Sequence, residues 1–177
     1  MDNNDEKMIA HILAGNPSGL NRLVARYGHM LAEYTRALTG DDDERFALIY
    51  EDILVDILKY ARSVSGRKGE LKRYLFESAA RTIRKRHPQI LRLADETKSQ
   101  SPPIKDLERV EEPTPELLDH VIAGLNPSER ELLLLRYRFG FSYADISDII
   151  REARVRLEDR MLNARHHFRS LLVHAQV

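Results

Sequence analysis

Prolines divide this chain into two parts. Four of its seven prolines lie within residues 94–115, a stretch rich in acidic and small polar residues with almost no periodic apolar positions. The pair Pro102-Pro103 cannot continue a helix, so the stretch favours an extended, solvated conformation. The sequence therefore predicts a first domain over residues 1–90, a flexible linker over 91–114 and a second domain over 115–177.

Both domains are predicted to be helical. Strand-forming residues never alternate cleanly with polar ones, whereas apolar residues recur every three or four positions. Asn16-Pro17 and Asn126-Pro127 read as an N-cap followed by a first-turn proline, and Glu129 completes a capping box with Asn126. The expected helices cover about 4–13, 17–38, 43–62 and 70–87 in the first domain, and about 115–122, 127–140, 143–150 and 153–173 in the second. The expected fold class is all-α: two small helical bundles joined by a flexible linker.

Composition argues against several classes of protein. The chain has no cysteine, so it has no disulfide framework and no thiolate metal site. Its seven histidines form no HExxH pattern, and the adjacent His166 and His167 point about 100° apart. No apolar stretch approaches the roughly 18 residues of a membrane span, and the acidic N-terminus is unlike a signal peptide. We expect a cytoplasmic protein that is not an enzyme, needs no cofactor or metal and does not insert into membranes.

Charge is balanced over the whole chain but not along it. The net charge is zero, yet residues 41–60 carry two basic and seven acidic residues, and residues 61–90 carry nine basic and two acidic residues. Alternating blocks of this kind favour separate binding surfaces over uniform solvation.

The fourth predicted helix carries the densest basic cluster. At 100° per residue, its apolar positions gather on one side and its cations on the other. Cations with aromatic neighbours are what single-stranded DNA binding requires, because charges bind phosphates and ring faces stack on bases. The alternative is a solvated charged face with aromatics half in the core. The candidate residues are Arg73, Tyr74, Arg81, Arg84 and Lys85.

A second candidate site runs from Ser142 to Met161. A short helix, a tight turn and a longer helix within about 20 residues have the spacing of a helix-turn-helix, whose second helix reads base edges in the major groove. The alternative is an ordinary helical hairpin in a small bundle. The residues that would face DNA from the second helix are Arg154, Arg156, Arg160 and Asn163.

These segments resemble parts of bacterial sigma factors of the extracytoplasmic-function class. Residues 124–150, GLNPSERELLLLRYRFGFSYADISDII, are similar to region four of that family, and Arg160, Met161, Ala164 and Arg165 continue its pattern. In the first domain, Leu20 to Gly40, Tyr50 to Leu54, Leu71 to Phe76 and Ala79 to Arg81 resemble successive parts of region two. The resemblance covers nearly the whole chain in the family's order.

The resemblance implies a sigma factor that binds core RNA polymerase and directs transcription initiation at promoter DNA, with an anti-sigma factor as a further partner. It assigns polymerase binding to Glu51, Asp52 and Asp56. It assigns the melted downstream promoter element to Arg73, Tyr74, Arg81, Arg84 and Lys85. It assigns the upstream element to the helix-turn-helix residues Ser142, Tyr143, Arg154, Arg156, Arg160 and Asn163.

The chain also departs from the family's pattern. Arg151 stands where the family has a glycine in the helix-turn-helix turn, and Glu158 and Asp159 lie early in the recognition helix, where phosphates would repel them. Tyr74 replaces a tryptophan, Arg81 an asparagine and Glu51 a glutamine. These departures leave an alternative open: a sigma-like binding module that sequesters polymerase or an anti-sigma partner without reading promoters.

Overall fold

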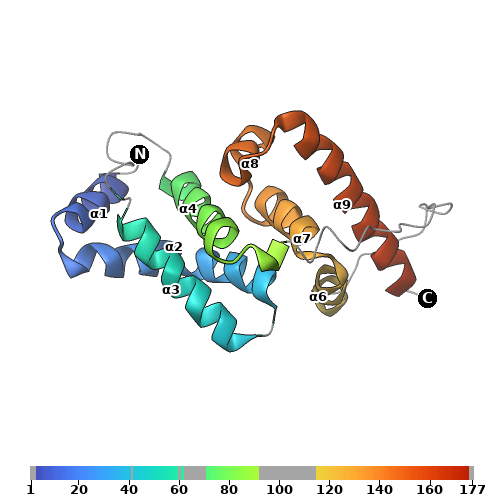
Figure 1. Cartoon of the computed structure of the whole chain (residues 1–177), viewed down its shortest axis with the longest axis horizontal. Helices are drawn as coiled ribbons and strands as arrows, with labels where there is room; N and C mark the ends of the chain where they lie inside the picture. Colours follow the sequence, from blue (N-terminus) through green and yellow to red (C-terminus); the bar gives the residue numbers. More distant parts are fainter. Residues whose placement is uncertain (1–2, 41, 60, 62–70, 92–114, 176–177) are drawn as a thin grey trace. The chain divides into compact units, whose positions relative to one another are not determined.

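The computed structural model describes residues 3–40, 42–59, 61, 71–91 and 115–175 (Figure 1). Every regular element in this part of the chain is helical, which confirms the all-α prediction. The chain divides into two compact units, the first of residues 1–88 and 148–151 and the second of residues 89–147 and 152–177. Apart from Leu91, the predicted linker lies outside the described residues, and its flexibility stays a prediction.

Four helices build the described part of the first unit. They are α1 (Asn3–Leu13), α2 (Pro17–Thr39), α3 (Asp43–Lys59) and α4 (Leu71–Arg86). Helix α1 packs on α2, α3 packs on α4, and α2 contacts both α3 and α4. Tyr34 of α2 and Phe76 of α4 meet edge to face at a centroid distance of 5.4 Å in the middle of the core. The other fully buried side chains around them include Leu31, Ile49, Ile53, Leu75 and Ile83.

Polar contacts join α1 to α2. The predicted cap is confirmed: the Asn16 side chain accepts a hydrogen bond from the Ser18 amide, and Pro17 opens the helix. The Tyr27 hydroxyl donates to the buried Asp5 carboxylate at 3.1 Å, and Arg26 lies 3.3 Å from the same carboxylate. Burial, together with the Asp5 charge, raises the pKa of Tyr27, so this hydroxyl remains a donor at neutral pH.

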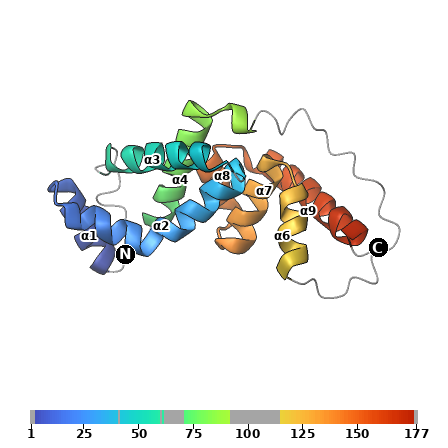
Figure 2. The same cartoon turned by 90° about the horizontal axis from the view of Figure 1, so that it is seen from below.

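The second unit contains α6 (Pro115–Gly124), α7 (Pro127–Leu133), α9 (Arg154–Ala175) and most of α8 (Tyr143–Ile150). Helices α6 and α7 both pack against α9 (Figure 2). The predicted capping box is confirmed, because Asn126 and Glu129 each bind the other's backbone amide. Glu129 also lies 2.8 Å from the Nδ1 atom of His167, which ties the start of α7 to α9. The core of this unit includes Val121, Leu132, Leu135, Ile146, Leu157, Met161 and Ala164.

One element differs from the sequence-based expectation. A single α-helix was expected from residue 127 to Gly140, but the helix changes to a π-helical segment at Leu134–Arg138. The Phe139 amide bonds to the Leu134 carbonyl, five residues earlier, at 2.9 Å. Gly140 follows with φ of 74° and ends the helix. Residue type carries little information about where such a segment forms, because it depends on the packing on both sides.

Candidate functional site

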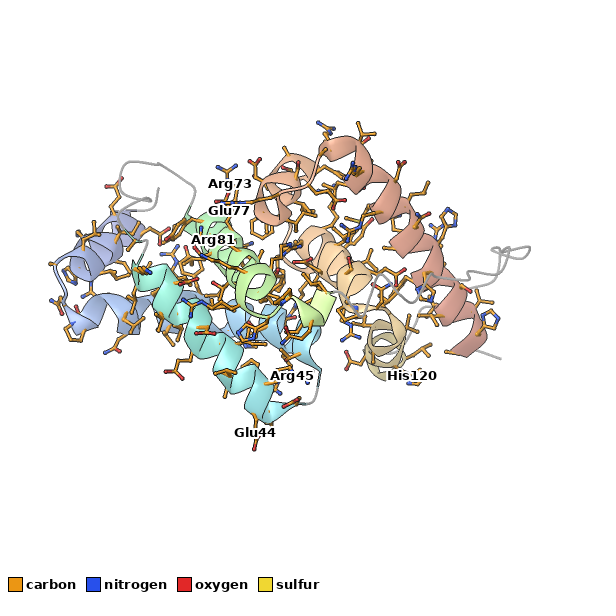
Figure 3. The ribbon with its side chains drawn as sticks, viewed as in Figure 1. Glu44, Arg45, Arg73, Glu77, Arg81 and His120 are labelled. Carbon is orange, nitrogen blue, oxygen red and sulfur yellow. The ribbon has the colours of Figure 1, made fainter. Side chains whose placement is uncertain are left out.

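Helix α4 separates a buried side from a cationic side. Leu71, Leu75 and Ile83 are at most 3% exposed and face the core, whereas Lys85 is exposed and Arg84 half-buried. Figure 3 shows Arg73, Glu77 and Arg81 along one side of α4. The structure therefore brings the predicted cations Arg73, Arg81, Arg84 and Lys85 onto the part of the helix that the core leaves uncovered.

Contacts within α4 hold several of these cations along the helix surface. Arg81 donates to the Ser78 hydroxyl at 3.1 Å, and Arg84 donates to the Ala80 carbonyl at 3.3 Å. Arg73 lies 3.7 Å from Glu77, one helical turn later. Partly exposed contacts of this kind are worth little, so a phosphate can replace them at small cost.

Tyr74 differs from the cations around it. It is 8% exposed, and its buried hydroxyl has no hydrogen-bond partner among the described residues. An unsatisfied buried hydroxyl costs about 1–3 kcal/mol. The sequence placed Tyr74 beside the basic arc, whereas the structure buries its side chain with the core residues of α4.

The acidic residues of α3 have unequal surroundings. Asp56 is 5% exposed and accepts hydrogen bonds from the Thr82 hydroxyl at 2.7 Å and from Arg86 at 2.9 Å. Asp52 pairs with Arg86 and lies 2.9 Å from the Nε2 atom of His87. Both carboxylates thus hold the C-terminal end of α4. Only Glu51, among the three predicted polymerase-binding acids, is exposed.

The electrostatics of Asp52 follow from these contacts. Burial alone would raise its pKa, but the hydrogen bond with His87 and the Arg86 guanidinium outweigh burial and lower the pKa. The carboxylate is therefore ionised at neutral pH and attracts both partners. Sequence reasoning missed Arg86 and His87, because their pairing depends on how α3 packs against α4.

The sequence analysis also missed an apolar patch on α3. Ile49, Ile53 and Ile57 form the buried stripe of this helix. At 100° per residue, Glu51 falls on the opposite side of the helix together with three apolar residues. These are Leu48, Val55 and Leu58, with exposed fractions of 58%, 48% and 39%. The helical angle of these positions relative to the isoleucines is a signal that could have identified them.

The helix-turn-helix begins with a reciprocal cap. The Ser142 hydroxyl accepts from the Asp145 amide at 3.1 Å, and Asp145 accepts from the Ser142 amide at 3.0 Å. Tyr143 is half-buried, with the Arg136 guanidinium 5.2 Å from its ring centre. Ser142 therefore starts helix α8, and Tyr143 packs back against the segment before it. Ser142 and Tyr143, both predicted to contact DNA, therefore also stabilise the local structure.

The turn between α8 and α9 contains a strained residue. Arg151 has φ of 56°, in the left-handed region that glycine adopts at no steric cost. The Ser147 carbonyl accepts from the Glu152 amide at 3.1 Å, and the Ser147 hydroxyl donates back to the Glu152 carbonyl. These hydrogen bonds thus hold the turn, although the Cβ atom of Arg151 makes its backbone conformation unfavourable.

The four candidate residues of α9 fall into two pairs. Arg156 and Asn163 are exposed and lie off the buried stripe of the helix. Arg154 bonds to Glu158 at 2.8 Å within α9. Arg160 contacts Glu152 and the Ser128 hydroxyl of α7, so it holds α9 against its neighbours. Only Arg156 and Asn163 reach solvent without one of these ion pairs.

Arg130 is another structural residue that sequence reasoning did not assign. Its guanidinium donates to the carbonyls of Ala123 and Leu125 at 3.1 and 2.8 Å. It therefore binds the end of α6 and orients the turn into α7. Burial lowers the pKa of Arg130, but arginine stays charged at any physiological pH.

The described residues also bear on cofactors and membranes. In the described ranges, no cluster of three or more His, Asp or Glu side chains is placed to hold a metal ion. None of the described helices combines the length and the apolar character needed to cross a membrane. What the arrangement offers chemically is cationic and apolar contact surface.

Comparison with known proteins shows which family and which solved structure the chain is similar to. A family model described as sigma-70, region 4 matches residues 116–152, which span α6, α7 and α8. No curated protein sequence matches the chain. Among solved structures, CnrH in complex with the cytosolic domain of CnrY is similar over 96% of this chain and 97% of that chain, with a TM-score of 0.62 and 19% identity. These findings confirm the resemblance to sigma factors: the chain has the all-helical fold of CnrH, and residues 116–152 match the model of sigma-70 region 4.

Proposed function

We propose that this protein is a sigma factor that binds core RNA polymerase in the cytoplasm and directs initiation at promoters, with no catalytic role of its own. The observation that carries the proposal is the sigma-70 region 4 match, which covers the helix-turn-helix up to its turn. Helix α9 follows that turn with Arg156 and Asn163 exposed, where a recognition helix needs side chains that reach base edges.

The first unit would bind the melted promoter strand. Lys85, Arg84 and their neighbours on α4 supply positive charge, and their weak intrahelical contacts leave them able to bind phosphates. Tyr74 would stack on a base only after its ring turns away from the core. A Phe at this position should therefore retain any stacking role, whereas Ala should remove it.

The polymerase contact is proposed on the exposed side of α3. Leu48, Val55 and Leu58 form an apolar patch around Glu51, whereas Asp52 and Asp56 face α4 and act by positioning it. An apolar patch with a charged residue among its members is typical of a protein interface.

This interface can be tested by co-purification with core polymerase. Replacing both Leu48 and Val55 by Ser should weaken retention strongly, and Glu51→Lys should weaken it further at low salt. Val24→Ser is the matched control, because Val24 is an exposed apolar residue on α2. Retention of the double variant at the level of the control would refute this surface.

A regulatory protein partner is also part of the proposal. CnrH was solved with the cytosolic domain of CnrY, and the present chain shares its fold across nearly its whole length. We infer an anti-sigma partner for this chain on that basis. A pull-down with the purified protein, followed by reconstitution with the captured candidate, should reduce polymerase binding.

Transcription itself is the decisive measurement. Core polymerase should initiate at specific sites on genomic DNA fragments when this protein is added and not when it is omitted. Absence of specific transcripts, combined with unimpaired polymerase binding, would contradict a promoter-reading role.

The second candidate function is a sigma-like module that occupies polymerase without reading promoters. The observation that favours it is Asp159, an exposed acid on the recognition helix beside Glu158. Neutralising both, to Glu158→Gln and Asp159→Asn, separates the two functions in promoter-fragment binding by the holoenzyme over a salt series. Loss of sequence discrimination supports promoter reading. A wild type without fragment preference, and a variant that binds everything more tightly, supports the occupying module.

A further inference from the structure

Helix α9 carries a regularly spaced row of residues on the side opposite its buried stripe. Leu157, Met161 and Ala164 are at most 1% exposed and pack toward α6 and α7. At 100° per residue, six other residues fall within an arc of about 80° on the opposite side. Val155 and Leu162, two of them, are 74% and 51% exposed. In chain order the six residues of this outer stripe are Val155, Asp159, Leu162, His166, Arg169 and Val173.

The outer stripe has the spacing of a coiled-coil seam. Its members follow one another at intervals of four, three, four, three and four residues, which is the alternation of d and a positions in a heptad. The stripe runs over roughly 27 Å of helix. A second helix laid along it would bury Val155 and Leu162, the two most exposed apolar residues of α9.

The order of charges along the stripe points to one kind of partner. Asp159 is the second residue from its N-terminal end and Arg169 the second from its C-terminal end. Neither forms a salt bridge within the part of the chain that the structure describes. In an antiparallel pair of identical helices, Asp159 lies opposite the partner's Arg169, and Val155 lies opposite the partner's Val173. A parallel pair would instead oppose like charges at both positions, which is unfavourable.

We propose that a second copy of this chain docks antiparallel on the outer stripe of α9 and forms a reversible dimer. The two Asp159–Arg169 contacts and the two Val155–Val173 contacts are related by the two-fold axis, as an isologous interface requires. The seam is short, and half of its residues are polar. The dimer is therefore weak and forms only at raised protein concentration.

Dimer formation has a consequence for the recognition helix, which rests on the proposed function. Arg156 and Asn163 border the outer stripe, so a second copy of α9 covers the residues proposed to reach base edges. The dimer and the DNA-bound form would therefore exclude each other. Asp159, which repels phosphates, has its favourable partner in the dimer.

Charge reversal tests the self-association directly. Sedimentation equilibrium of the full chain should show wild-type mass rising toward the dimer as protein concentration increases. Asp159→Arg and Arg169→Asp should each remain monomeric, because every cross-pair then joins like charges. An equimolar mixture of the two variants should associate again, since each pair becomes Arg opposite Asp. Arg22→Asp, at an exposed position of α2, is the control and should behave as wild type.

Disulfide trapping tests the orientation of the two α9 helices. The chain has no native cysteine, so only the introduced cysteines can form a disulfide. A mixture of Val155→Cys and Val173→Cys chains should cross-link under mild oxidation. Either variant alone should not, because identical positions lie ~27 Å apart in the antiparallel pair, beyond disulfide reach. Cross-linking of Val155→Cys chains with one another would overturn the antiparallel arrangement.

These experiments use free protein, so their failure leaves the proposed sigma function untouched. A wild type that stays monomeric at all concentrations, or single reversals that associate like wild type, would overturn the dimer. Adding duplex promoter fragments should lower the dimer fraction. Association unchanged at saturating duplex would overturn the mutual exclusion of the dimer and the DNA-bound form.

Discussion

Arg86 at the end of α4 and Arg154 at the start of α9 both form ion pairs, but the acids that pair with them lie in different places. The partners of Arg86 are Asp52 and Asp56, which belong to the neighbouring helix α3. The partner of Arg154 belongs to the same helix, where Glu158 lies one turn away. The first arrangement joins two helices, whereas the second stays local.

This difference decides what the same residue types do. Acids on α3 stabilise the packing of the first unit and lie away from the cations on the outer side of α4. Acids on α9 stand among the residues that would approach DNA and compete with phosphate for Arg154. Counts of charged residues along the sequence do not distinguish these two situations, because both segments are basic on average.

The largest effect is expected where the acid joins two helices. Asp56→Ala should destabilise the first unit by about 3 kcal/mol, because Arg86 and Thr82 lose a buried acceptor. Hydrogen exchange of the α3 and α4 amides measures this local stability. Glu158→Ala on α9 should change the stability of its unit by no more than about 0.5 kcal/mol. Equal losses of stability in the two variants would show that an acid that joins two helices contributes no more than an acid paired within one helix.

Binding to DNA should differ between the two helices in kind. Arg156→Ala or Asn163→Ala should cost about 1–3 kcal/mol at one base pair and relax preference there. Lys85→Ala should weaken binding to all promoter fragments alike and lower the log–log salt slope by roughly 0.7 to 0.9. Fragment binding by the holoenzyme over a salt series reports both quantities. A sequence-specific loss from Lys85→Ala would reverse the roles assigned to α4 and α9.

A smaller effect is expected in the turn before α9. Arg151→Gly should stabilise the helix-turn-helix by roughly 0.5–1 kcal/mol, because φ of 56° strains any residue with a Cβ. Arg151→Ala keeps the strain and removes the charge, so it serves as the control and should not stabilise. Thermal unfolding followed by a probe placed in the second unit would show the difference.

The smallest effect concerns acid. Because the pKa of Asp52 is lowered in the folded protein, its contribution to stability is present above its unfolded pKa of about 4 and is lost as pH falls through the lower folded value. Asp52→Asn should therefore flatten the loss of first-unit stability below about pH 4. Glu44→Gln, which removes an exposed carboxylate near the start of the same helix (Figure 3), is the control variant.

Local signals predicted most of the helix boundaries. Asn16-Pro17 and Asn126-Pro127 mark helix starts with chemistry that operates within a few residues, and both caps form as expected. Which acids on α3 are free could not be predicted in the same way. The pairing of Asp56 with Thr82 joins residues 26 apart in sequence and exists only once α3 and α4 have packed.

The candidate surfaces divide along the same line. Arg156 and Asn163 follow from helical periodicity alone, and the structure leaves them exposed. Arg160 satisfies the same periodicity but contacts Ser128 across the bundle, which no local pattern reveals. Periodicity therefore predicts which side of a helix a residue occupies, but not whether another element already binds it.

The π-helical segment Leu134–Arg138 affects how the chain after it responds to the loss of one residue. A π turn is an α-helical turn with one residue added. Because the extra residue is taken up within one wide turn, deleting one residue here would convert the turn to α-helix and leave the chain after it on nearly the same side of the helix axis. Phe141, whose amide bonds to the Leu135 carbonyl at 3.0 Å, would still point toward the core, and α8 would begin in nearly the same direction. A deletion earlier in α7, where no wide turn absorbs it, would instead rotate the helix-turn-helix by about 100° about the helix axis.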